Sequence, residues 1–274
     1  MMNKKVILLT GASSGIGFDT ARMLARQGHI VYGAARRVER MEELKIDGVI
    51  PLALDVTDAL SCHQAVEQIM TGQNRIDVLI NNAGYGSYGA IEDVSLEEAK
   101  RQFEVNVFGL ARLTKEVLPY MRQQKSGRII NVSSIGGRLT TYFGGWYHAT
   151  KYAVEGLSDA LRMETKEFGI TVSLIEPGGI KTEWGGIAAD HLEQSSRGGA
   201  YEQAAAKVAA SIRKQYTGKM MADPAVVSRA ISQAVNQNHP KTRYVIGFGA
   251  KPLVFLHAIL PARIFDWIMM RAVA

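Results

Sequence analysis

Short apolar runs alternate along the chain with longer stretches in which apolar residues recur every three or four positions. The apolar runs lie at residues 6–9, 30–34, 48–54, 76–80, 128–132, 171–175 and 243–246. Continuous runs of this length are typical of strands buried on both faces of a parallel sheet. Their alternation with helical patterns predicts an α/β fold, a doubly wound parallel sheet of about seven strands with helices on both faces, in a single domain over residues 1–274.

The intervening patterns predict the helices. Expected helices follow Gly17 and cover residues 59–70, 95–122, 147–161, 201–216 and 224–236. Asp58 is well placed to cap the helix that starts at Ala59. Within residues 95–122, Asn106 stands among apolar neighbours, where an unsatisfied amide is costly, so it is either a structural hydrogen-bonding residue or part of a polar relay.

Two segments near the C-terminus depart from the strand and helix alternation. Residues 183–223 are rich in glycine around the helix expected at 201–216, and we expect a substrate lid there. Residues 252–274 form an apolar extension that Pro261 should break into two helices. Docking of this extension against the same subunit or a partner is favoured over contact with a membrane surface. Its length and its charged residues exclude a membrane span.

The amino-acid composition limits which kinds of ligand and which cellular compartment are expected. The 274 residues are 47% hydrophobic and 21% charged, with a net charge of +6. A positive charge suits an anionic ligand such as a nucleotide, but the basic residues are scattered, so no nucleic-acid partner is expected. The single cysteine, Cys62, excludes an intrachain disulfide and a cysteine cluster for zinc, and no metal site is expected. The N-terminus does not resemble a signal peptide, and we expect a cytoplasmic protein.

A glycine-rich turn follows the first apolar run. The turn comprises Gly11, Ala12, Ser13, Ser14, Gly15, Ile16 and Gly17, and a helical pattern follows it. Glycines at this spacing allow the backbone to approach a ligand, and amides at a helix start favour a phosphate. Gly11 to Gly15 also match the G-x-S-x-G nucleophile elbow of α/β-hydrolases. Only ten residues precede Gly11, whereas an elbow normally follows several strands, so the hydrolase is the weaker alternative.

The end of the second apolar run bears on cofactor choice. A dinucleotide fold that prefers NAD places an acid there, whereas this chain has Ala35, Arg36 and Arg37. Two guanidinium groups favour the 2′-phosphate of NADP over NAD. The alternative is that both arginines are simply solvated.

Candidate chemistry gathers on one further helix. Tyr147 and Lys151 are four residues apart, which places both on one helical face, so a cation beside the phenol should lower its pKa from about 10. Ser134 stands at the carboxyl end of the fifth expected strand, where ligands bind in open parallel sheets. The aromatic residues Tyr88, Tyr142, Phe143 and Trp184 form either an apolar pocket or ordinary packing.

With these motifs in this order, the chain resembles the short-chain dehydrogenase/reductases over residues 4–182. The resemblance rests on residues 10–17, Asp55, the segment 81–84, Asn106, Ser134, Tyr147 with Lys151, and Pro177 with Gly178. A finer similarity points toward the 17β-hydroxysteroid and retinol dehydrogenase branch. The family suggests a homodimer or homotetramer.

The resemblance implies roles for individual residues. Tyr147 is the expected general acid/base, Lys151 lowers its pKa and holds the ribose, Ser134 polarises the carbonyl, and Asn106 supports a proton path. Val132 and Ile180 would flank the nicotinamide. The expected cofactor-binding residues are Gly11, Ser13, Ser14, Gly15, Ile16, Gly17, Arg36, Arg37, Asp55, Val56, Asn82, Ala83, Gly84, Tyr147, Lys151, Pro177, Gly178, Ile180 and Thr182. Asp55 contacts an adenine edge or bonds its own loop.

The sequence therefore predicts an oxidoreductase that transfers a hydride between NADP(H) and a ketone, aldehyde or alcohol, with an apolar substrate favoured. A regulatory protein that binds NADP(H) without turnover is the alternative from another class. An intact set of Ser134, Tyr147 and Lys151 argues against it, since a sensor has no need of all three.

Overall fold

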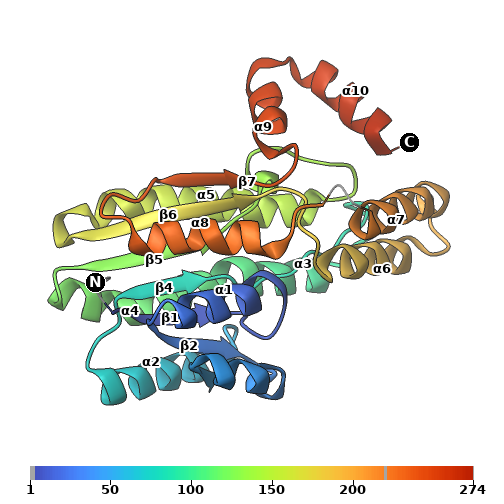
Figure 1. Ribbon diagram of the computed structural model, residues 1–274. Helices are drawn as coiled ribbons and strands as arrows, with labels where there is room; N and C mark the ends of the chain where they lie inside the picture. Colours follow the sequence, from blue (N-terminus) through green and yellow to red (C-terminus); the bar gives the residue numbers. More distant parts are fainter. Residues whose placement is uncertain (1–3, 219–220, 274) are drawn as a thin grey trace.

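The seven expected apolar runs form one parallel sheet. The computed structural model describes residues 4–218 and 221–273, so residues 219, 220 and 274 of the expected lid and extension lie outside it. The strands are β1 (Val6–Thr10), β2 (Ile30–Ala35), β3 (Val49–Ala53), β4 (Val78–Asn81), β5 (Gly127–Val132), β6 (Ile170–Pro177) and β7 (Arg243–Ile246). They lie in the order β3-β2-β1-β4-β5-β6-β7, and every neighbouring pair is parallel, which confirms the expected fold (Figure 1).

Helices cover both faces of this sheet. They are α1 (Gly15–Arg26), α2 (Ala59–Gln73), α3 (Leu96–Phe103), α4 (Leu110–Gln123), α5 (Gly145–Glu164) and α8 (Pro224–Asn236). One apolar core joins α1 and α8 to the sheet, and a second joins α2 and α4 to the opposite face. A smaller core fixes α5 beside α4 through Val154 and Leu110. The cap expected at Asp58 is present, because its carboxylate accepts from the amides of Leu60 and Ser61.

The strand order places a topological switch point between β1 and β4. The chain moves outward from β1 to β2 and β3, then returns to the other side of β1 as β4. Ligands of open α/β sheets bind outside the carboxyl ends of the strands at such a point. The glycine turn after β1 and the segment 82–84 after β4 both open onto it.

The helix expected over residues 95–122 contains an irregular segment. A π-helical stretch, η2 (Glu104–Gly109), separates α3 from α4 and carries Asn106. A side chain at Gly109 would come within 2.8 Å of Val56, so the backbone passes the neighbouring loop closely at this point. Such π segments are rare and often occur at functional sites.

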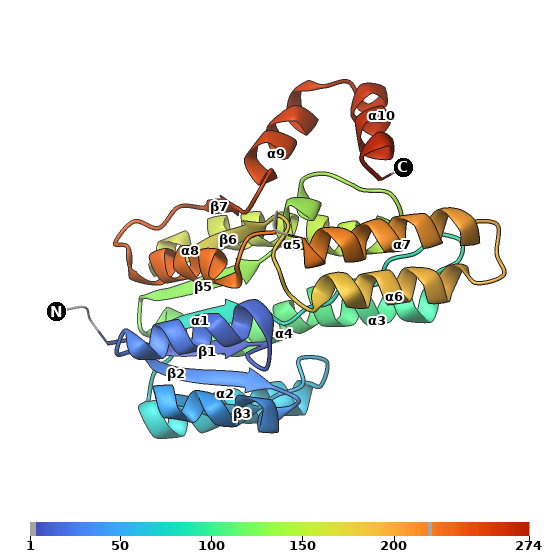
Figure 2. The ribbon, with the colours of Figure 1, turned by 45° about the vertical axis from the view of Figure 1, so that its right-hand side comes forward.

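Two helices lie beyond the carboxyl ends of the strands, where the sequence predicts one. They are α6 (Trp184–Ser196) and α7 (Glu202–Thr217), which pack side by side (Figure 2). The helix α6 was not expected from the sequence, because Gly185 is a packing residue here. A Cβ atom there would lie 2.2 Å from the Tyr216 ring, so glycine allows α6 to approach α7.

The C-terminal extension forms two helices, α9 (Ala250–Ile259) and α10 (Ala262–Val273), that stand away from the sheet (Figures 1 and 2). The break expected at Pro261 is confirmed. Among the helices of the described residues, none has the length and apolar character needed to cross a membrane.

Candidate active site

The glycine turn after β1 forms a narrow backbone cradle. Gly11 has a φ of 70°, which favours glycine, and a Cβ atom at Gly17 would lie 2.1 Å from the Gly11 carbonyl oxygen. The N-cap of α1, Ser14, makes no side-chain capping bond. The first amides of α1 therefore have no side-chain partner from the N-cap and remain available to a phosphate.

Thr10 and Asn82 clamp this cradle to the end of β4. The Thr10 hydroxyl accepts hydrogen bonds from the amides of Asn82 and Ala83, both at 3.0 Å. The Asn82 side-chain amide in return donates to the Thr10 carbonyl at 3.0 Å and to the Gly11 carbonyl at 3.3 Å. Asn82 and Ala83 thus hold the switch point together, and Gly84 continues the same edge.

Arg36 and Arg37 lie beside the glycine turn. Ala34 is paired with Thr10 in the sheet, and Ala12 donates to the Ala34 carbonyl at 3.2 Å, so Arg36 emerges next to the cradle. Both arginines are exposed, and neither forms an ion pair within residues 4–218 and 221–273. Two unpaired cations therefore border the site.

Asp55 and Val56 close the adjacent loop after β3. The Asp55 carboxylate accepts from the Thr57 amide at 2.9 Å and from the Thr57 hydroxyl at 2.8 Å. The sequence left open whether Asp55 contacts an adenine edge or bonds its own loop. For Oδ1 of Asp55, the structure supports bonding within the loop. The Val56 carbonyl accepts from the Arg112 guanidinium at 2.7 Å, which ties the loop to α4.

Ser134, Tyr147 and Lys151 are brought together where β5 meets α5. The Lys151 ammonium donates to the Val132 carbonyl at 3.0 Å and lies 5.9 Å from the centre of the Tyr147 ring. Ser134 follows β5 directly and donates to the Pro177 carbonyl at 3.3 Å, while its oxygen accepts from the Gly136 amide at 3.0 Å. Both Tyr147 and Lys151 are buried.

Burial sets the protonation states of this group. It raises the pKa of Tyr147 above its usual range, and the neighbouring Ser134 hydroxyl acts in the opposite direction. Burial also lowers the pKa of Lys151 to about 8, against the opposing charge of Glu155. The direction at Tyr147 is opposite to the one expected from the sequence, because desolvation of the phenolate by burial outweighs the hydrogen bond with Ser134. Tyr147 is a neutral phenol at neutral pH in this geometry.

Asn106 holds the strand-to-helix loop after β4. Its side-chain oxygen accepts from the Tyr85 amide at 3.0 Å, and its nitrogen donates to the Tyr85 carbonyl at 2.9 Å. The same nitrogen donates to the Thr150 hydroxyl at 3.1 Å, and Thr150 donates to the Tyr147 carbonyl at 2.7 Å. These bonds support the structural reading of Asn106 and link it to the turn of α5 that carries Tyr147.

The end of β6 forms the remaining wall. Gly178 donates to the Ile246 carbonyl at 2.7 Å, which fixes the turn after Pro177, and Ile180 is buried. The Thr182 methyl group would lie 3.4 Å from a Cβ atom at Gly15, so this segment faces the glycine cradle.

His148 is a positioning residue that the sequence analysis did not single out. Its Nδ1 lies 3.0 Å from the Gly136 carbonyl, and its Nε2 accepts from the Thr141 amide at 3.0 Å. Because a carbonyl only accepts, Nδ1 carries the proton and the ring is neutral. Burial lowers the pKa of His148. The His148 ring therefore connects the loop of Ser134 to α5. Its position directly after Tyr147 is the sequence feature that could have predicted this role.

A buried cluster of charged residues, which was not predicted from the sequence, lies next to Lys151 on α5 through Glu155. Glu155 and Glu176 both pair with Arg243 at 3.1 Å, and Arg138 reaches Glu176 at 3.4 Å. Burial raises the pKa of both Glu155 and Glu176. The sequence feature that could have predicted this cluster is the spacing of Glu155, which follows Lys151 by one helical turn.

Aromatic rings from α6 and from the loop after β4 pack against the ring of Tyr147. Trp184 has its ring centre 5.1 Å from that of Tyr147, and the Tyr88 ring centre lies 5.9 Å from it. Tyr142 and Phe143 instead stack on each other at 3.9 Å. Of the four aromatic residues expected to line a pocket or to pack, Trp184 and Tyr88 therefore face the site directly.

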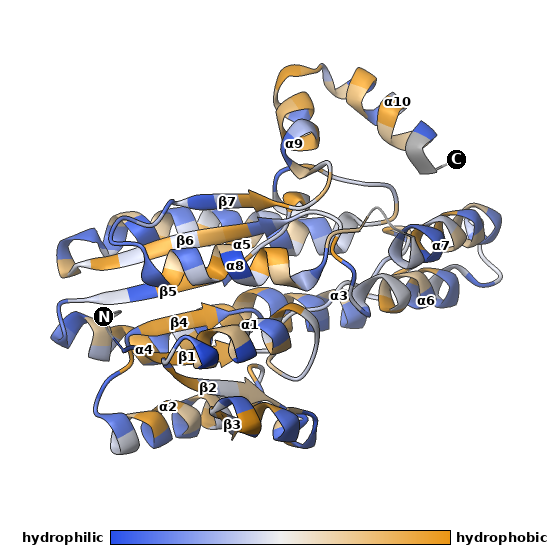
Figure 3. Cartoon of the chain, in the orientation of Figure 1, coloured by the Kyte–Doolittle hydropathy of each residue, from blue (hydrophilic) through white to orange (hydrophobic). Residues whose placement is uncertain are grey.

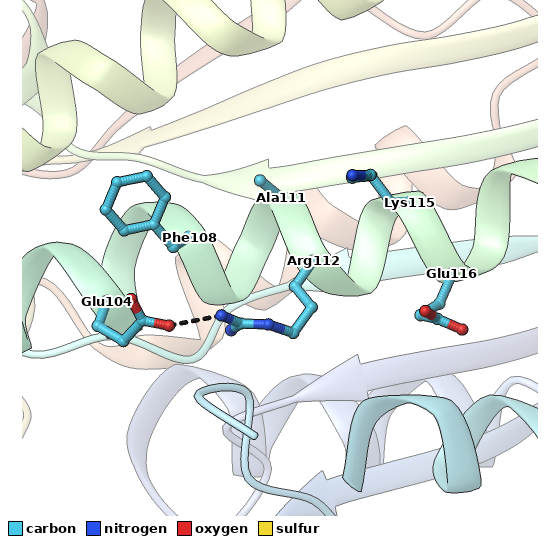
Figure 4. Close-up of a pocket in the computed structure, with 6 residues that line it drawn as sticks. All are labelled: Glu104, Phe108, Ala111, Arg112, Lys115 and Glu116. Atoms are coloured by element: carbon cyan, nitrogen blue, oxygen red, sulfur yellow. Dashed lines mark hydrogen bonds and ion pairs between the residues drawn. The ribbon is translucent and has the colours of Figure 1, made fainter. Parts of the chain in front are cut away.

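A separate surface hollow of about 480 Å³ lies along η2 and α4 (Figure 4). It is lined by Glu104, Phe108, Ala111, Arg112, Lys115 and Glu116. Figure 4 shows that these side chains come from one helical face, with Glu104 and Arg112 paired at 2.6 Å. None of Ser134, Tyr147 and Lys151 lines it, so it is distinct from the site.

The chain matches the short-chain dehydrogenase family over residues 5–191. The chain belongs to this family. It is 50% identical to a 3-ketodihydrosphingosine reductase of Bacteroides thetaiotaomicron over 181 residues, 66% of each chain. It is 33% identical over 288 residues to mouse 17-beta-hydroxysteroid dehydrogenase type 6, covering 98% of this chain and 88% of the relative. A short-chain dehydrogenase structure from Streptomyces avermitilis superposes with a TM-score of 0.81 at 34% identity, over 98% of both chains.

Family membership confirms the resemblance seen in the sequence. This short-chain dehydrogenase is an oxidoreductase, and its family binds nicotinamide cofactors and acts on small molecules. The hydrolase alternative for Gly11 to Gly15 is therefore removed.

Proposed function

We propose that this short-chain dehydrogenase interconverts an apolar ketone or aldehyde and its alcohol, using NADP(H) in preference to NAD(H). The observation that carries the proposal is the grouping of Ser134, Tyr147 and Lys151 beneath the aromatic rings of Trp184 and Tyr88. This group lies next to a backbone cradle suited to a dinucleotide.

The described residues fit such a cofactor. Side chains at Gly11 or Gly17 would fill the cradle, and the first turn of α1 presents uncapped amides toward a diphosphate. Arg36 and Arg37 are exposed and unpaired within the part of the chain that the structure describes, where a 2′-phosphate would meet them. No acid at the end of β2 opposes that phosphate, which supports NADP.

The reduction follows from the protonation states. When bound, the nicotinamide supplies a hydride to the carbonyl carbon or accepts one from the alcohol. Ser134 donates a hydrogen bond to the substrate oxygen as negative charge develops on it. Tyr147, a neutral phenol, transfers its proton to that oxygen, and the Lys151 ammonium stabilises the phenolate left behind. Solvent then returns a proton to Tyr147.

The substrate class is inferred from the lining. Rings of Trp184 and Tyr88 bury apolar area beside the reacting group. Two relatives are named for a ketosphingoid and a steroid, both largely apolar molecules with a carbonyl or alcohol. These names support an apolar substrate for this chain, and we further infer a homodimer or homotetramer.

The test is turnover by the purified protein. We expect NADPH oxidation with long-chain or polycyclic ketones, and weaker activity with short charged ketones. NADH should be the poorer reductant. Tight NADPH binding without turnover of any carbonyl in the panel would instead favour the regulatory alternative.

A further inference from the structure

The α9–α10 pair exposes more apolar surface than its packing requires. Phe255 is 63% exposed and Trp267 is 56% exposed, and the other exposed large apolar residues of the pair are Ile259, Ile264 and Met270. Hydropathy colouring shows apolar stretches along both helices, away from the body of the protein (Figure 3). The sequence favoured docking on the same subunit or on a partner, and the part of that docking made within this chain is limited to few residues, chiefly Ala250 and Phe265.

The apolar residues of α9 are not confined to one face. Residues 253–256 are four consecutive apolar side chains, and at 3.6 residues per turn they point to all sides of the helix. Within α9, only Ala250 is buried. A helix that is apolar on all sides is normally buried, either in the core of a protein or in the apolar part of a membrane, so α9 is expected to be covered.

The charges of the pair fit an anionic surface. Residues 248–274 contain three basic residues, Lys251, Arg263 and Arg271, and a single acid, Asp266. Arg271 lies over the Trp267 ring at 4.3 Å, so a cation and an amphipathic ring share one position on α10. Tryptophan and arginine placed together suit the boundary between lipid headgroups and acyl chains.

We propose that the α9–α10 pair docks onto the surface of a membrane that contains anionic lipid. The helices, of 10 and 12 residues, lie in the plane of the interface and do not cross the bilayer. Phe265 is buried and α10 contacts α7, so the docked pair stands beside the segment proposed as the lid. An apolar substrate in the bilayer would then meet the lid without crossing water. Docking itself does not depend on turnover.

The test uses vesicles of phosphatidylcholine with and without phosphatidylglycerol. We expect the protein to sediment with the anionic vesicles and much less with the neutral ones, and added salt should release it. The double substitution Phe255→Ser with Trp267→Ser should weaken partitioning by about tenfold or more. Ile46→Ser, which removes an apolar side chain that is 91% exposed on a different helix, is the matched control and should bind normally.

Trp267 also supplies an optical readout. The chain has three tryptophans, and only Trp267 is placed to enter the lipid. Vesicles should shift its emission to shorter wavelength, and Trp267→Phe should lose the shift while still sedimenting. The serine variants should keep full turnover of a small water-soluble ketone, which separates this inference from the proposed reaction.

Two outcomes would overturn the proposal. One is a wild-type protein that stays in the supernatant with anionic vesicles. The other is a protein whose oligomer dissociates on Phe255→Ser with Trp267→Ser while vesicle binding is unchanged, because the exposed face would then be an interface between copies of this chain.

Discussion

The indole of Trp184 lies over the phenol of Tyr147, with ring centres 5.1 Å apart and planes inclined by 57°. This contact joins the first residue of α6 to the proposed proton donor. The indole therefore packs against the ring that carries the proposed proton donor, so we expect changes in α6 to affect the reaction.

Replacement of Trp184 should test this expectation. Trp184→Ala is expected to lower kcat/KM for an apolar ketone by about tenfold to a hundredfold, since a large apolar contact is worth about 1.5–3 kcal/mol. The dissociation constant of NADPH should stay unchanged. Gly86→Ala is the matched variant, because its Cβ atom would lie 2.3 Å from the indole and push it without removing it. Unchanged kinetics in both variants would remove Trp184 from the site.

Loss of the phenol hydroxyl should abolish the reaction. Tyr147→Phe is expected to reduce kcat by at least about a hundredfold, the usual contribution of a positioned general acid. The melting temperature and NADPH affinity should remain close to wild type, since the ring and its packing are kept. Steady-state kinetics with parallel cofactor titration check this, and near-normal turnover would assign proton transfer to another group.

Asn106 should affect stability as well as rate. Asn106→Leu leaves the main-chain groups of Tyr85 without partners, at a cost of about 1–3 kcal/mol for each buried group. Denaturant unfolding measures this loss. Thr150→Val, which removes only one partner of the amide, should cost less. A stable Asn106→Leu protein with a strongly reduced rate would revive the proton-relay reading.

His148 should make the fold sensitive to acid. The pKa of His148 is lowered from about 6.5 by burial, so below that pH the unfolded chain binds the proton more readily than the folded one. Stability is therefore expected to fall as pH drops below about 6.5, when a proton on Nε2 would oppose the Thr141 amide. The other titratable groups against the ring, Tyr88 and Tyr147, stay neutral in this range. The check is to record melting curves from pH 7.5 to 5 in steps of about 0.5 pH units. The melting temperature of His148→Gln should depend less on pH than that of the wild type.

The cofactor preference should depend on charge at the end of β2. NADPH is expected to bind about tenfold to a hundredfold more tightly than NADH, because a charge-assisted contact contributes about 1.5–3 kcal/mol, and salt should narrow the gap. Ala35→Asp with Arg36→Ala should reverse the order. Arg122→Ala, an exposed arginine at the far end of α4, is the control. Equal affinities of the wild type for NADPH and NADH would support the alternative that Arg36 and Arg37 are simply solvated.

Local patterns were sufficient for the strands and for most helices. A buried parallel strand must be apolar on both faces, so runs such as residues 6–9 identify it without a partner. Asp58 and Pro261 mark helix boundaries through their own backbone chemistry, and the cradle at Gly11 and Gly17 follows from the absence of side chains. These features depend on residues close together in the chain, and the sequence alone determines them.

The tertiary structure decided what depends on burial and on distant partners. Glycine at position 185 by itself suggests a loop, and only the packed structure shows that it makes room for the Tyr216 ring. The pKa of Tyr147 rises because folding removes water from the phenol. Arg243 meets Glu155 and Glu176 across long stretches of chain. Desolvation and contacts between remote segments arise only when the elements pack together, so local sequence patterns do not contain them.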